Sequence, residues 1–200
     1  MKKVLVINGY ISDDSQSTTH AVVEKFLAYY QAKNPDDEII TLDLNDVPMA
    51  SITLSRQNMA TYFNENDSDK YIEQLKGVDK VIMASPMINF CISPLVKNYF
   101  DHILVANKTF SYKYAEKGKS KGLLDHLSVE IIVSQGSPLD WYTFIDLPKY
   151  IAGLWDFAGA KISGTILNDG TKTEAWKNQG GIAHALQKLD AQIKADAEKF

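Results

Sequence analysis

Residues 81–104, VIMASPMINFCISPLVKNYFDHIL, decide the fold of this chain. The first residues form an apolar run typical of a strand buried on both faces. Ser93 followed by Pro94 is a typical helix start, because serine caps the helix and proline suits its first turn. A strand, a loop and a helix in this order form the place where open α/β sheets bind ligands. The loop 87–90 gathers three apolar side chains around one amide, which suits a flat aromatic cofactor better than a phosphate or a metal.

Four other segments resemble this strand, and amphipathic helical patterns lie between them. The five expected strands are residues 3–7, 38–44, 80–84, 128–133 and 161–167. Five strands that alternate with helices predict an α/β fold with a doubly wound, five-stranded parallel sheet. Because the GxGxxG fingerprint is absent, the flavodoxin-like strand order 2-1-3-4-5 fits best. In this order FMN is expected where strands 1 and 3 meet, so the loops after strands 1, 3 and 4 are the candidates.

Composition narrows the classes of function. Two hundred residues with 45% hydrophobic content predict one domain, residues 1–200, with a sizeable core. A net charge of -4 argues against nucleic acid and anionic membranes as partners. Cys91 is the only cysteine, so an intramolecular disulfide is excluded, and we expect it to be a small buried residue. With neither a signal peptide nor a spanning segment expected, the predicted location is the cytoplasm.

The first candidate loop crowds polar side chains at the start of a helix, at Ser15, Gln16 and Ser17. Free amides and hydroxyls at a helix start form a natural phosphate site. The alternative is ordinary capping by Ser15 or Ser17. Asp13 and Asp14 oppose phosphate binding unless both point outward.

The second loop carries Met87, Ile88, Asn89 and Phe90. Asn89 and the backbone amides can bond the polar edge of an isoalloxazine ring, while Met87 and Phe90 pack on its apolar part. The alternative is an apolar loop buried under the next helix.

The third loop carries Ser134, Gln135, Gly136 and Ser137. Glycine permits a close backbone approach and its neighbours offer donors, so this loop can hold the far edge of the ring. The alternative is a turn that only ends a strand. All three loops follow strands at the same predicted edge of the sheet, which favours a common site.

Other kinds of site lack their signatures. The sequence has no HExxH, GxSxG or GxxxxGK[ST] pattern, and no metal site is expected. Four aromatic residues can line a substrate pocket or simply pack: Tyr112, Tyr114, Tyr142 and Trp155.

These motifs resemble one known family, the bacterial FMN-dependent NADH azoreductases, also described as NADH:quinone oxidoreductases. The likeness runs over the whole chain and is carried by KVLVI (3–7), SQS (15–17), PMINFCISPLVKNYFD (86–101), TFSY (109–112) with Gly118 and GL (122–123), and SQGS (134–137).

The resemblance implies a flavodoxin-like homodimer with FMN near the dimer interface. It implies that Ser15, Gln16 and Ser17 hold the phosphate, that the loops 87–90 and 134–137 hold the ring, and that Tyr112 lies near the substrate. NADH would pass hydride to FMN and leave, and a quinone or azo compound would then accept it. No side chain need act as acid or base, so no catalytic residue is named.

The chain also departs from the usual pattern of that family. Gly9 and Tyr10 stand where a serine is common, and Ile88 replaces a tyrosine. Gln135 replaces an arginine, which reduces the positive charge near the flavin. Two alternatives stay open: a flavodoxin-type electron carrier that does not oxidise NADH, and a flavin-free α/β binding module.

Overall fold

The computed structural model describes residues 1–113 and 121–200. Five parallel strands form a sheet in the order β2-β1-β3-β7-β8. Their bounds are β1 (Lys3–Asn8), β2 (Glu38–Asp43), β3 (Lys80–Ile88), β7 (Ser128–Ser134) and β8 (Lys161–Asn168). A short β4 (Cys91–Ile92) pairs antiparallel with the end of β3. The predicted fold class and the order 2-1-3-4-5 are therefore confirmed.

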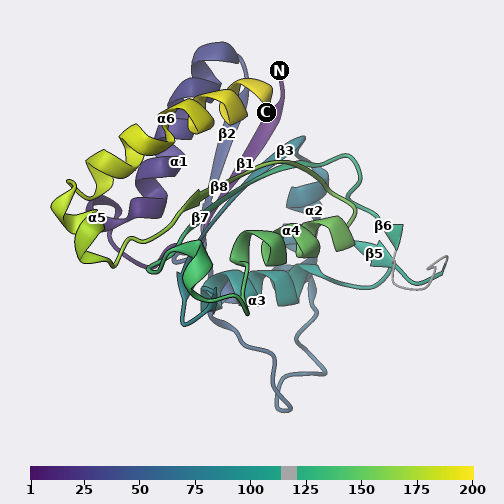
Figure 1. Ribbon diagram of the computed structural model, residues 1–200. Coiled ribbons are helices and arrows are strands. Elements are labelled where there is room, and N and C mark those ends of the chain that lie inside the picture. Colours follow the sequence, from purple (N-terminus) through teal and green to yellow (C-terminus); the bar gives the residue numbers. More distant parts are fainter. Residues whose placement is uncertain (114–120) are drawn as a thin grey trace.

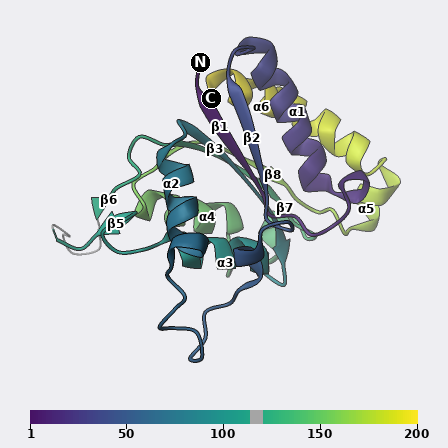
Figure 2. The same cartoon turned by 180° about the vertical axis from the view of Figure 1, so that it is seen from behind.

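Helices cover both faces of the sheet (Figures 1 and 2). One face carries α1 (Thr18–Lys33) and α6 (Ile182–Lys199), with α5 (Glu174–Asn178) beside them. The other face carries α2 (Lys70–Lys76), α3 (Pro94–Ile103) and α4 (Leu147–Phe157). No helix in residues 1–113 and 121–200 is long and apolar enough to cross a membrane.

Short elements complete the fold. They are the antiparallel pair β5 (Phe110–Ser111) and β6 (Lys121–Gly122), the 3-10 helices Asp14–Gln16, Pro48–Ser51 and Leu139–Trp141, and a π-helix at Glu65–Asp69. Residues 49–63 contain the end of the second 3-10 helix followed by turns and irregular chain.

The core explains why this sequence folds as a two-sided sheet. Val4 and Val6 of β1 pack in the cluster under α1 and α6, whereas Leu5 and Ile7 pack in the cluster under α3 and α4. Successive strand residues point to opposite faces, so a continuous apolar run is buried on both sides.

Ser93 ties this core to the edge where the strands end. Its Oγ accepts a hydrogen bond from Val96 N at 3.3 Å, which caps α3, and donates to the carbonyl of Gly9 at 2.7 Å. The start of α3 is thereby fixed against the loop that follows β1.

One acidic side chain lies inside the core. Glu130 of β7 is fully buried, and neither carboxylate oxygen has a hydrogen-bond partner among the described residues. Gly164 of the adjacent β8 leaves room for it, since an added Cβ there would lie 2.9 Å from Glu130 Oε1. Burial, with a smaller contribution from Asp196, raises the pKa of Glu130 to about 8, and Lys199 opposes this rise.

We expect this carboxyl group to make stability depend on pH. Its usual pKa is near 4.5, so its favourable contribution is complete below that pH and is lost as pH rises toward about 8. Glu130→Gln should therefore gain stability relative to wild type between pH 5 and pH 8, by on the order of a few kcal/mol. Urea unfolding at several pH values measures this difference, and a difference that does not change with pH would contradict it.

Candidate cofactor and substrate cleft

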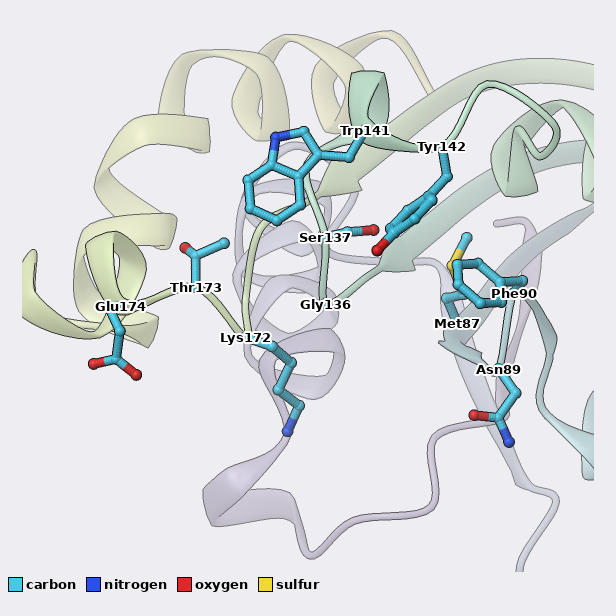
Figure 3. Close-up of a pocket in the computed structure, with 10 residues that line it drawn as sticks. All are labelled: Met87, Asn89, Phe90, Gly136, Ser137, Trp141, Tyr142, Lys172, Thr173 and Glu174. Atoms are coloured by element: carbon cyan, nitrogen blue, oxygen red, sulfur yellow. The ribbon is translucent and has the colours of Figure 1, made fainter.

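Two adjoining cavities lie where the parallel strands end. The smaller has a volume of about 400 Å³ and the larger about 530 Å³. They share Met87, Gly136 and Lys172, so together they form one cleft. The smaller cavity is further lined by Tyr10, Ile11, Ser12, Gln16, Ser17, Thr18, Thr19, Pro86, Ile88, Ser134, Gln135, Thr171 and Trp176. The larger is further lined by Asn89, Phe90, Ser137, Trp141, Tyr142, Thr173 and Glu174 (Figure 3).

The first loop presents the start of α1 to the smaller cavity. Ser17 is buried and caps α1, since its Oγ accepts a hydrogen bond from His20 N at 3.1 Å. Ser17 therefore both caps α1 and lines the smaller cavity, and Gln16 lines the cavity beside it. Ser15, expected to share this site, lies in the exposed 3-10 helix and lines neither cavity.

The acidic pair of this loop faces elsewhere. Asp13 and Asp14, together with Asp43, line an adjoining hollow that shares Tyr10, Ile11 and Ser12 with the smaller cavity, but neither aspartate lines the cleft itself. The electrostatic objection to an anion beside Ser17 is thereby reduced, because neither carboxylate lines the cavity that Ser17 lines.

Tyr10 fastens the loop to the helix behind it. Its buried hydroxyl lies 2.8 Å from His20 Nδ1, and its carbonyl accepts a hydrogen bond from Asn45 Nδ2 at 2.9 Å. Burial and then the nearby Asp14 raise the pKa of this phenol, so Tyr10 stays neutral at physiological pH. Tyr10 therefore fixes the position of the first loop and also forms part of the wall of the smaller cavity.

The second loop is the tip of a tight hairpin. Ile88 pairs with Cys91, which leaves Asn89 and Phe90 as the two turn residues, with positive φ angles of 47° and 65°. Such angles are uncommon for phenylalanine, and strained residues of this kind cluster at functional sites. Phe90 is 42% exposed, so the loop is not simply buried under α3. Cys91 is also exposed, so the expectation of a buried cysteine was wrong, because the hairpin lifts it off the core.

The third loop places unsatisfied polar groups in the smaller cavity. Ser134 and Gln135 are almost fully buried, yet Ser134 Oγ and Gln135 Oε1 have no partner among the described residues. The other end of the Gln135 amide is held, since Nε2 donates to the carbonyl of Ser137 at 2.9 Å. Buried polar atoms rarely remain without partners, so these oxygens point to a polar ligand.

A fourth segment, which the sequence reasoning missed, closes the cleft. Residues 170–174, after β8, contribute Thr171, Lys172, Thr173 and Glu174. Only the loops after strands 1, 3 and 4 were considered, although β8 ends at the same edge beside β7. The turn NDGT at 168–171 after an apolar strand was the available signal.

The aromatic residues that were candidates for a substrate pocket lie in different environments. Tyr142 lines the larger cavity beside Trp141, whereas Trp155 is fully buried and packs on Phe100 with ring centroids 5.3 Å apart. Tyr112 is 67% exposed and lines neither cavity. Tyr114 and Gly118 lie outside the described residues. In the part of the chain that the structure describes, no group of three or more histidine, cysteine or acidic side chains could hold a metal ion.

Comparison with known proteins gives a consistent assignment. A family model described as a flavodoxin-like fold matches residues 2–193. Two proteins named FMN-dependent NADH:quinone oxidoreductase are close in sequence. The one from Malacoplasma penetrans is 47% identical over 200 residues, which cover all of this chain and 94% of that protein. The one from Mycoplasmopsis pulmonis is 48% identical over 200 residues and covers both chains completely.

Solved structures agree on the fold. An azoreductase from Bacillus anthracis str. Sterne superposes with a TM-score of 0.80 at 23% identity, over the full length of both chains. An FMN-dependent NADH-azoreductase from Bacillus anthracis str. Ames Ancestor, in complex with FMN, gives 0.76 at 24% identity and covers 98% of this chain and 97% of that one. The resemblance drawn from the motifs is confirmed: the chain belongs to the family of FMN-dependent NADH:quinone oxidoreductases, built on the flavodoxin-like fold.

Proposed function

We propose that this chain is an FMN-dependent NAD(P)H oxidoreductase that reduces quinones and azo compounds by two electrons. The observation that carries the proposal is the cleft itself, in which a polar cavity adjoins an aromatic cavity at the carboxyl ends of the strands. Relatives at 47% and 48% identity bear the name of this activity. The whole chain, residues 1–200, acts as a single FMN-binding domain in this proposal.

The smaller cavity fits the polar part of FMN. Ser134 Oγ, Gln135 Oε1 and Trp176 Nε1 are buried atoms without partners among the described residues, and all three side chains line this cavity. The start of α1, with Gln16 and Ser17, would hold the phosphate, because free amides at a helix start bind anions.

The junction of the two cavities would hold the ring. Met87 and Gly136 line both cavities, so the ring would lie between the second and third loops. Ile88, Asn89 and Phe90 complete the wall on the hairpin side, and Ser137 lies on the other. Bound FMN supplies the hydride chemistry, and the protein supplies binding, orientation and exclusion of water.

The larger cavity suits flat acceptors. Phe90, Trp141 and Tyr142 are aromatic walls that can stack on a quinone or an azo compound. No side chain in this cavity has to move a proton, so we assign none a catalytic role. Donor and acceptor would use the same space in turn.

We also propose that the protein is a homodimer that acts in the cytoplasm, where NADH is supplied. Three aromatic side chains near the larger cavity are markedly exposed, namely Trp141 (61%), Tyr142 (40%) and Phe144 (71%). Exposed apolar groups that lie together often mark an interface. Sedimentation velocity at several concentrations tests the proposal, and a monomer at every concentration would exclude a stable dimer.

Removal of Trp141 should weaken the use of flat acceptors. An aromatic pair is worth about 0.5–1.5 kcal/mol beyond burial, so Trp141→Ala should lower kcat/KM for menadione roughly 2- to 10-fold. Ferricyanide, which has no aromatic face, is the matched control and should be reduced as by wild type. An equal loss for both acceptors would mean that the variant disturbs the cofactor.

Steady-state kinetics test the function as a whole. NADH oxidation should require both FMN and menadione, and reciprocal plots at several menadione concentrations should give parallel lines. Protein that binds FMN but consumes no NADH with any quinone would favour the electron carrier instead.

A further inference from the structure

The segment that carries Lys172 is hydrogen-bonded to the backbone of the third loop. Lys172 N donates to the carbonyl of Gly136 at 2.9 Å, Thr171 N donates to that of Gln135 at 3.1 Å, and Gly170 N donates to that of Ser137 at 3.1 Å. The lysine stem lies on Gly136, because a Cβ added there would be 2.8 Å from Lys172 Cγ. The lysine stem can pack on the backbone at this point because Gly136 has no side chain.

The Lys172 ammonium group has no ion-pair partner among the described residues. It forms no ion pair with any carboxylate in residues 1–113 and 121–200, and its neighbour Glu174 pairs instead with Lys177 at 2.8 Å. Of the described residues that line the smaller cavity, Lys172 is the only charged one. In Figure 3 its side chain runs away from Trp141 and toward the purple ribbon of the first loop.

The opposite wall of this cavity is suited to an anion. Ser17 and the first residues of α1 line it, and Asp13 and Asp14 line the adjoining hollow but not this cavity. A helix start favours negative charge through its free amides and its dipole. The smaller cavity thus has one ammonium group and one helix start among its walls and no carboxylate among its described lining residues, whereas Glu174 lines the larger cavity.

We propose that the Lys172 ammonium group binds the phosphate of FMN from the side opposite the first loop. The inference rests on the proposed function. Lys172 supplies a positive charge in the cavity that Gln135 also lines, from the segment that hydrogen-bonds to the third loop. An ammonium group near a phosphate forms charge-assisted hydrogen bonds, which are stronger than neutral ones.

The test compares FMN with riboflavin, which has the same ring and ribityl chain but no phosphate. Dissociation constants are measured by quenching of flavin fluorescence on the full-length protein, for wild type, Lys172→Met, Lys172→Arg and Lys177→Met. Lys177 is the matched control, because it is an exposed lysine that lines neither cavity.

Lys172→Met should weaken FMN binding about 10-fold or more and leave riboflavin within about 2-fold of wild type. Lys172→Arg should restore most of the FMN affinity, and Lys177→Met should behave as wild type. Added NaCl should weaken FMN binding less in Lys172→Met than in wild type, because a charge pair is missing.

Three results would overturn the inference. If Lys172→Met binds FMN as wild type does, the lysine does not bind the phosphate, although the proposed function stands. If FMN and riboflavin weaken equally, the lysine acts on the ring or through packing. If wild type binds neither flavin, the proposed function fails and takes this inference with it.

Discussion

Ser17→Asp should lose FMN almost completely. Aspartate caps helices as well as serine does, so the start of α1 should survive the change. The new carboxylate would stand in the smaller cavity, close to the expected phosphate. Repulsion between a carboxylate and a phosphate dianion a few ångströms apart should weaken binding by roughly 100-fold or more. Flavin fluorescence titration measures the effect.

Ser17→Asn is the matched control, since asparagine has the same shape and also caps helices but carries no charge. Its FMN affinity should stay much closer to wild type. Riboflavin should bind to both variants with similar affinity. If the Asp and Asn variants bind FMN equally well, the phosphate does not lie beside Ser17.

Gly9→Ala should destabilise the protein severely. A Cβ at this position would overlap Val96 Cγ2 of α3 and lie 2.9 Å from the carbonyl oxygen of Ala84. The backbone cannot easily retreat, because Gly9 N donates to Ala84 O at 2.9 Å and Ser93 Oγ bonds to its carbonyl. Overpacking of this kind costs about 3 kcal/mol or more, and flavin binding should fall with it. Urea denaturation measures the free energy of unfolding.

Gly153→Ala provides the contrast. Gly153 lies inside α4, and an added Cβ meets nothing within 4 Å. This variant should be more stable than wild type by about 0.5–1 kcal/mol, because alanine favours helices. If Gly9→Ala unfolds at the same urea concentration as wild type, the close approach of β1 to α3 is not as tight as described.

The contacts of Gly9 also explain why this chain has glycine where a serine is common in the family, which the sequence alone did not explain. A serine there would meet Val96, so the glycine belongs with the branched residue that packs over it. Such a pairing cannot be read from a single sequence, because it joins residues far apart in the chain.

The sheet could be predicted because its signals are local. The three central strands β1, β3 and β7 contain apolar runs, and their two-sided burial follows from the run itself. The edge strands β2 and β8 are less buried and were located by short apolar stretches between turn signals. The loops could be placed at one edge because all parallel strands end there. Ten of the eleven residues expected to bind the cofactor do line the cleft, although their contact with FMN stays a prediction.

The features that the sequence did not reveal depend on the direction of single side chains. Ser15 was grouped with Gln16 and Ser17, yet the 3-10 helix that precedes α1 turns it outward. Lys172 was missed because a lysine after a DGT turn looks like any surface lysine. Its role in the cleft arises only when β8 pairs with β7 and brings residues 170–172 against the third loop.

An anaerobic absorption spectrum shows whether the protein carries electrons from NADH to a quinone through bound FMN. Purified protein is mixed with FMN, freed of the excess, and titrated with NADH and then with menadione. We expect the protein to keep its yellow flavin bands, NADH to bleach them, and menadione to restore them. Protein that keeps no flavin, or flavin bands that NADH leaves unchanged, would contradict it.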